Sequence, residues 1–130
     1  MITHLRICFV LCIALFSGNV AAQYSYEFTQ KIYSASGVQE LGNANWTLST
    51  DAGYFGYDLT KGQQIGSEKN PASTLTFATS DIIGTISEVT IETSGASSIG
   101  ANLTINVGNT GFGDSYQLTT TSTSHTFTGS

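Results

Sequence analysis

The chain has 130 residues, with nine acidic side chains against four lysines and arginines and a formal net charge of −5. This balance argues against a nucleic-acid-binding surface, because phosphate contacts are made by clustered Lys and Arg. Serine and threonine are abundant, and regularly placed Ile, Leu, Val and aromatic residues supply the apolar surface that disordered chains lack. A threonine-rich, lysine-poor composition favours strands over helices.

The first 22 residues differ from the rest of the chain. Arg6 lies near the start, an apolar run extends from Ile7 to Phe16, and the small residues Val20 and Ala22 fit the −3 and −1 positions of a cleavage site. This pattern predicts a signal peptide cleaved after Ala22. The apolar run is too short to span a bilayer, which needs about 20 residues. We therefore expect residues 23–130 to be secreted, extracellular or at the cell surface.

Both cysteines, Cys8 and Cys12, lie in this leader, so the mature domain has no disulfide and no cysteine metal site. Residues 23–130 form a chain long enough to bury its own core as a single domain. An exported domain of this size without disulfides points to a bacterial source.

Alternating apolar and polar residues, separated by Gly, Ser and Asn turns, recur along the mature chain. They predict short strands within Tyr24–Tyr33, Val38–Leu41, Ala44–Thr50, Tyr54–Asp58, Gln63–Gly66, Ser73–Ala78, Thr85–Thr93, Ala101–Val107, Tyr116–Thr120 and His125–Thr128. The boundaries around 54–66 are the least defined, because that stretch is rich in glycine. The pattern predicts an all-β fold, an antiparallel β-sandwich that is jelly-roll-like with about eight or nine strands.

Two details of strand pairing follow from the same pattern. Glu88–Thr93 and Ala101–Val107 alternate cleanly across a polar, glycine-bounded linker, which predicts that these two strands pair. Ile86 falls on the opposite parity to Val89. Either a bulge lies between these two residues, or Ile86 joins neighbouring isoleucines in capping one end of the core.

The chain stops at Ser130, shortly after the last predicted strand. Two alternatives remain: the domain is complete, or it is a fragment whose closing strand lies beyond Ser130. A domain without its closing strand would have an open sheet edge, and exposed edges pair with other chains.

The best functional lead is the stretch from Trp46 to Ser67, which holds the only tryptophan, three other aromatics, two aspartates and four glycines. Neighbouring side chains in a strand alternate faces, so we expect at least one ring near Tyr54 to stand outside the core. Sugar rings stack on aromatic faces while amides bind their hydroxyls. The predicted ligand-binding residues are therefore Trp46, Tyr54, Tyr57, Gln63 and Gln64. The alternative is that these rings fill the core.

Catalytic and metal-binding patterns are weak. His125 is the only histidine after the leader, and a nucleophilic site needs a hydroxyl or thiol beside a base. Asp51 and Asp58 resemble a glycosidase carboxylate pair, but turn aspartates are common for local reasons. Asp51, Asp58 and Asp114 are candidate ligands for a structural calcium ion. We expect a protein that is not an enzyme and needs no cofactor.

Four segments resemble one group of modules: residues 45–48 (NWTL), 53–58 (GYFGYD), 60–64 (TKGQQ) and 93–98 (TSGASS). They look like the β-sandwich modules near the N-terminus of secreted bacterial multidomain proteins, sometimes ahead of an extracellular nuclease or other hydrolase domain. The resemblance implies a galactose-binding-like jelly roll with an accessory role. It carries no ligand residue over to this chain.

These observations give two functional hypotheses. The first is a secreted non-catalytic β-sandwich module that binds a glycan or another cell-surface component, or that acts in adhesion. The alternative is a structural or assembly module attached to a missing C-terminal catalytic domain, such as an extracellular hydrolase or nuclease.

Overall fold

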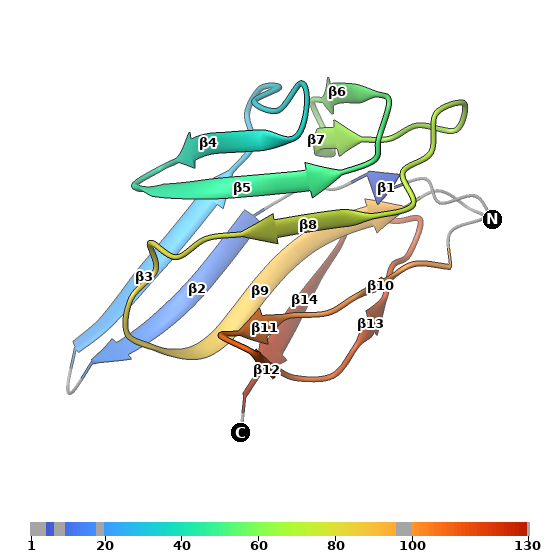
Figure 1. Ribbon diagram of the computed structural model, residues 1–130. Coiled ribbons are helices and arrows are strands. Elements are labelled where there is room, and N and C mark those ends of the chain that lie inside the picture. Colours follow the sequence, from blue (N-terminus) through green and yellow to red (C-terminus); the bar gives the residue numbers. More distant parts are fainter. Residues whose placement is uncertain (1–4, 7–9, 18–19, 96–99, 130) are drawn as a thin grey trace.

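The computed structural model describes residues 5–6, 10–17, 20–95 and 100–129 (Figure 1). In this part of the chain no helix occurs, and every strand pair is antiparallel. The all-β, antiparallel prediction is therefore confirmed. The strands are β1 (Leu5–Arg6), β2 (Val10–Ser17), β3 (Val20–Glu27), β4 (Gly37–Leu41), β5 (Ala44–Thr50), β6 (Phe55–Asp58), β7 (Gly62–Ile65), β8 (Leu75–Ala78), β9 (Thr85–Gly95), β10 (Asn102–Leu103), β11 (Asn106–Val107), β12 (Thr110–Gly111), β13 (Tyr116–Gln117) and β14 (Thr123–Thr128).

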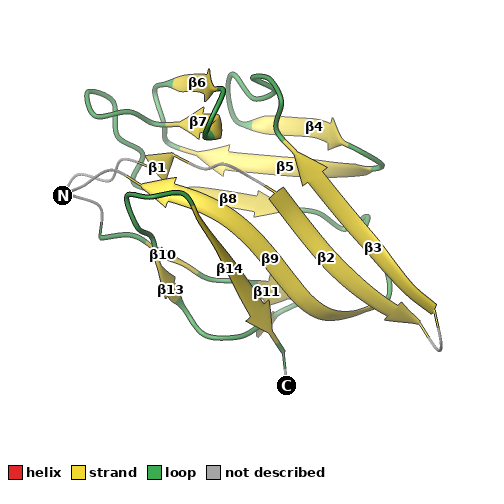
Figure 2. Ribbon diagram, turned by 180° about the vertical axis from the view of Figure 1, so that it is seen from behind, coloured by secondary structure: helices red, strands yellow, loops and turns green. Residues whose placement is uncertain are grey.

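The largest sheet is built around β9. Its strand order is β3-β2-β9-β1-β7-β6, and β14 also pairs with β9. A three-stranded sheet, β4-β5-β8, lies over this large sheet, and two short pairs, β10-β13 and β11-β12, complete the molecule (Figures 1 and 2). The strands are shorter and divided among more sheets than the jelly-roll prediction assumed, and the jelly-roll topology stays a prediction.

Strand β5 shows how the sequence produces this arrangement. Ala44, Trp46 and Leu48 are buried, while the residues between them are exposed, as the alternation predicts. A two-residue turn joins β4 to β5, and Gly42 adopts a positive φ of 67° there, which glycine allows without strain. The observed bounds of β5 are those predicted.

Two pairing predictions have different outcomes. The predicted pairing of 88–93 with 101–107 is wrong: β9 pairs with β2, β14 and β1, whereas β10 and β11 pair with β13 and β12. Alternation shows which face of a strand is buried but does not specify its neighbour. The bulge prediction is confirmed, because the register between β9 and β2 shifts between Ile86 and Glu88.

The predicted leader overlaps this fold. Residues 1–22 include β1, β2 and the first part of β3, and β2 is the strand with which β3 pairs. Cleavage after Ala22 is not tested by this arrangement and stays a prediction. From Gln23 onward, side chains also attach this part of the chain, since Tyr24 of β3 and Phe28 just after it belong to the core.

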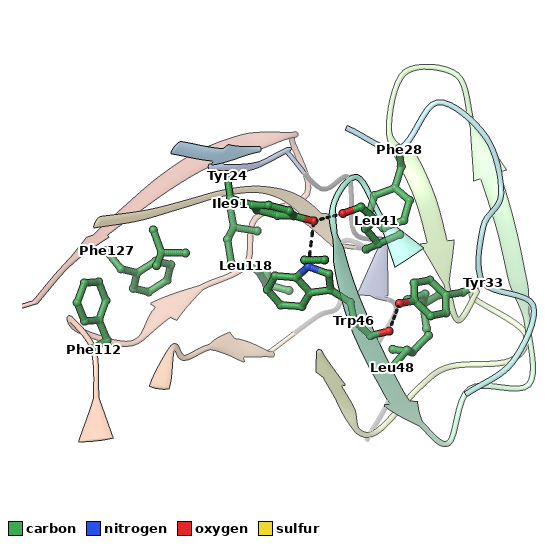
Figure 3. Close-up of a cluster of buried hydrophobic side chains, with 13 residues drawn as sticks. Tyr24, Phe28, Tyr33, Leu41, Trp46, Leu48, Ile91, Phe112, Leu118 and Phe127 are labelled. Carbon is green, nitrogen blue, oxygen red and sulfur yellow. Dashed lines mark hydrogen bonds between the residues drawn. The ribbon is translucent and has the colours of Figure 1, made fainter. Parts of the chain in front are cut away.

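A single apolar core lies between the sheets (Figure 3). Its buried members include Tyr24, Phe28, Tyr33, Leu41, Trp46, Leu48, Ile65, Val89, Ile91, Phe112, Leu118 and Phe127. Near the C-terminal end, Gly129 packs so closely on the ring of Phe112 that no space is left for an added Cβ. The residue after β14 therefore contacts the segment that follows β12.

A buried amide connects three parts of this core. The side chain of Gln63 has no solvent exposure. Its Oε1 accepts hydrogen bonds from the N–H groups of Ile32 and Tyr33, at 2.9 and 3.0 Å. Its Nε2 donates to the carbonyl oxygens of Tyr33 and Gly56, each at 3.1 Å. Gln63 thus satisfies backbone groups of the β3–β4 connection, which has no strand ladder to do so.

The network continues through side-chain hydroxyls. Tyr33 donates from its hydroxyl to the carbonyl oxygen of Trp46, at 2.6 Å. The indole Nε1 of Trp46 donates to the Tyr24 hydroxyl at 2.9 Å, and that hydroxyl donates to the carbonyl oxygen of Leu41 (Figure 3). Burial raises the pKa of Tyr33 to about 12. The polar atoms of the core are therefore used to join its elements.

We predict that Gln63→Leu destabilises the fold by about 3 kcal/mol or more, because several buried backbone groups lose their partner and each costs about 1–3 kcal/mol. The free energy of unfolding, measured by urea denaturation, checks this. Gln64→Leu is the matched control at the next, half-buried position and should change it by less than about 1 kcal/mol. Equal effects of the two substitutions would contradict the role given to Gln63.

Candidate functional site

The five predicted ligand-binding residues do not converge on one surface. The indole of Trp46 is only 8% exposed, and Gln63 is fully buried in the network described above. Strands β6 and β7 form a hairpin in which Tyr57 lies opposite Gln63, and Gly56 lies opposite Gln64. Because paired residues share a face of a sheet, the half-buried Tyr57 belongs to the inner face with Gln63. Gln63 is not accessible to a surface ligand in this structure, whereas the little-exposed Trp46 lines the cavity described below.

Tyr54 and Gln64 remain on the outer side of this hairpin. Tyr54 is 40% exposed, and its ring lies against Gly56, where an added Cβ would be 2.8 Å from the Tyr54 hydroxyl oxygen. Gly56 in turn lies opposite the half-buried Gln64. The exposed ring expected near Tyr54 is thus Tyr54 itself, and it lies beside an amide. Their role in ligand binding stays a prediction.

The two candidate catalytic aspartates are used in local hydrogen bonds. Asp51 Oδ1 accepts from the N–H groups of Ser73 and Thr74 at 2.8 and 3.0 Å, and its Oδ2 accepts from the Ser73 hydroxyl. Asp58 Oδ1 accepts from the N–H and hydroxyl of Thr60 at 2.8 and 2.7 Å. These bonds lower the pKa of both carboxyl groups. A glycosidase acid needs the opposite, a raised pKa.

The other titratable candidates also have structural surroundings. The imidazole of His125 stacks on Tyr116 with ring centroids 4.0 Å apart, and it meets the edge of Phe127 at 4.7 Å. Asp114 is an exposed residue. Among the described residues, no three His, Cys, Asp or Glu side chains are grouped so that they could hold a metal ion. The calcium prediction for Asp51, Asp58 and Asp114 remains untested.

One concave feature of the structure was not predicted from the sequence. A cavity of about 590 Å³ lies between β8 and the segment from β10 to β11, and we call it the β8–β11 groove. Its floor is formed by Val89 and Ile91 of β9, and its sides carry apolar residues from both flanking segments. The alternation of 101–107 predicted the apolar face but not that this face borders an open cavity.

The lining of the β8–β11 groove is neutral and largely apolar. Eight of its described side chains are only partly buried although they pack on the core, namely Tyr26, Leu75, Phe77, Ile82, Ile86, Leu103, Ile105 and Val107. Threonine, asparagine, Tyr26 and Trp46 supply its side-chain polarity, and none of the described lining residues is charged. The described residues that line the groove lie within 26–108.

No protein-family model, curated protein or solved structure matches the chain. The resemblance to accessory modules of secreted bacterial proteins therefore stays an expectation. None of the described residues forms a helix long and apolar enough to cross a membrane.

We predict that Asp51 makes the free energy of unfolding fall more steeply as the pH is lowered. Its pKa is lowered from 3.8 to about 2, chiefly by the Ser73 hydroxyl and then by the N–H groups of Thr74 and Ser73. On acidification the unfolded state takes up this proton first. The contribution of ionised Asp51 to stability is therefore present above about pH 4 and is lost as the pH falls towards about 2.

Unfolding free energies of wild type and Asp51→Asn, measured from pH 5 to pH 2, test this prediction. The variant should lose stability less steeply in this range than wild type. Asp114→Asn removes another exposed carboxylate and should keep the wild-type slope. Identical slopes for wild type and Asp51→Asn would show that the Ser73 and Thr74 contacts do not contribute to folding.

Proposed function

We propose that this chain is a secreted, non-catalytic β-sandwich module, jelly-roll-like in topology, that acts in adhesion or assembly by binding a partner in the β8–β11 groove. The observation that carries the proposal is the groove itself, an uncharged apolar cavity of about 590 Å³. This volume falls in the range of about 300–1,000 Å³ typical of binding sites. Partly buried Leu, Ile and Phe side chains gain about 25 cal/mol per Å² when a partner covers them.

The surroundings of the titratable groups support binding over catalysis. The pKa values of Asp51 and Asp58 are lowered, so neither is suited to donate a proton near neutral pH. His125 packs between aromatic rings rather than beside a nucleophile in a cleft. The apolar groove offers contact area without a reacting group.

We predict that the groove binds a neutral apolar dye such as Nile red with one-to-one stoichiometry. Ile105→Phe should weaken dye binding at least tenfold, because the larger side chain fills part of the cavity. Ile83→Phe is the matched control: the substitution is the same, but Ile83 is 84% exposed and does not line the groove. Fluorescence titration of the full chain checks this. Any dye that binds residues 1–22 adds the same signal to the titrations of both variants. Equal affinities of the two variants would contradict the proposal.

A second candidate function is glycan binding at the outer side of the β6–β7 hairpin. The observation that favours it is the exposed ring of Tyr54, lying against Gly56 and beside Gln64. A ring held flat on a sheet can stack on the apolar face of a sugar while an amide binds a hydroxyl. This site is smaller than the five-residue site predicted from the sequence, because Trp46 and Gln63 are buried.

If this candidate is right, Tyr54→Ala reduces binding on a polysaccharide array at least tenfold, since it removes the stacking surface. Leu59→Ala is the control, because Leu59 is 87% exposed on the same hairpin and its loss leaves the Tyr54 ring in place. Absence of any polysaccharide signal from the wild-type chain, or unchanged binding by Tyr54→Ala, would exclude a glycan site here.

A further inference from the structure

The residues along the β8–β11 groove show that it follows two strand edges. Consecutive residues line it on both flanks: 75–79 on the β8 side and 103–108 on the other side. Successive side chains of a strand point to opposite faces, so a cavity that meets only one face is lined by alternate residues. The floor behaves in this way, with Val89 and Ile91 lining the groove and Thr90 absent from it. The flanks instead present their backbone edges.

These edges have partners on one side. β8 is the last strand of its sheet and pairs with β5. The 101–107 segment is joined on its other side to residues 110–118: Phe112 donates from its N–H to Ile105 O at 2.8 Å, and Leu118 donates to Ala101 O at 3.0 Å. The sides that face the groove are therefore strand edges, where backbone N–H and C=O groups can accept a further strand. A small apolar molecule would leave these groups without hydrogen bonds.

The directions of the two flanks specify how one strand fits between them. β8 and the chain from β10 to β11 run in the same direction in both views (Figures 1 and 2). The strand pairs among the described residues are all antiparallel, so direct pairing of these two flanks would create a parallel pair unlike any of them. One inserted strand that is antiparallel to both flanks continues the pattern of the fold.

We infer that the β8–β11 groove accepts an extended segment of a partner polypeptide, about six residues long, as a strand antiparallel to β8. This inference rests on the proposed function and specifies its ligand class. Its mode is β-strand addition, in which main-chain hydrogen bonds give affinity and pockets for alternate side chains give specificity.

The lining also specifies the chemistry of that segment. Side chains directed inward meet Phe77, Ile91 and Ile105 and must be apolar. Side chains directed outward lie beside exposed Thr76 and Asn106, which suit Ser, Thr or Asn. The chain has nine carboxylates and four basic side chains, which favours basic residues on either side of the bound strand.

An eight-residue peptide, KTLTITVK, has this pattern and serves as the probe. Isothermal titration into the full chain should show one-to-one binding. The same peptide with N-methyl groups on its leucine, isoleucine and valine keeps every side chain but loses the N–H donors along one edge. It should bind at least tenfold more weakly. Ile105→Phe should weaken binding of the unmodified peptide at least tenfold, whereas Ile83→Phe should leave it unchanged.

The direction of the bound peptide relative to β8 is tested by a separate measurement. A spin label on the peptide N-terminus should broaden the amide resonances of Ala78 and Val107 more than those of Leu75 and Leu103, because an antiparallel strand starts where the two flanks end. The reverse order of broadening would overturn the antiparallel assignment.

The remaining outcomes separate this inference from the proposed function. If Nile red binds and the N-methylated peptide binds as tightly as the parent, the groove takes apolar ligands without strand pairing, and only this inference fails. If neither dye nor peptide binds, both fail. Sedimentation of the protein alone should show a monomer. A dimer that the peptide dissociates would identify a second copy of the chain as the occupant and overturn assignment to a separate partner.

Discussion

The fold depends on one buried amide. The segment from Phe28 to Ser36 crosses from the large sheet to β4 without a strand ladder, and its backbone groups at Ile32 and Tyr33 would otherwise be buried without partners. Gln63 satisfies them from β7 and simultaneously holds Gly56 of β6. Tyr33 then donates to Trp46 of β5, and Trp46 donates to Tyr24 of β3, so the network extends to two further strands.

The two halves of the domain differ in how many polar groups join their elements. Around Gln63 and Trp46, side-chain hydrogen bonds join the elements of the interior. Trp46 also borders the β8–β11 groove, whose two flanks carry mainly apolar side chains. The same layer therefore includes a closed end that fixes the strands and an open end with space for a ligand.

The sequence predicted the features that depend on local alternation. β5 was predicted at its observed bounds because Ala44, Trp46 and Leu48 alternate with polar residues, and the outward ring near Tyr54 follows from the same rule. Strand partners could not be predicted in this way: 101–107 has a clear apolar face, but neither its neighbours nor its open edge is encoded in its own pattern. Gln63 was misplaced on the surface because a buried glutamine looks like an exposed one until the backbone groups around it are known.

The long reach of the polar network also affects how the chain folds. Gln63 contacts residues 30 and 31 positions earlier, and Trp46 contacts Tyr24 across 22 positions. Such contacts form only after long loops have closed, and domains dominated by them fold in about milliseconds to seconds rather than microseconds. During that interval the edges of β8 and of the 101–107 segment stand open beside apolar side chains. A molecule that covers these strand edges during that interval would prevent them from pairing with other chains.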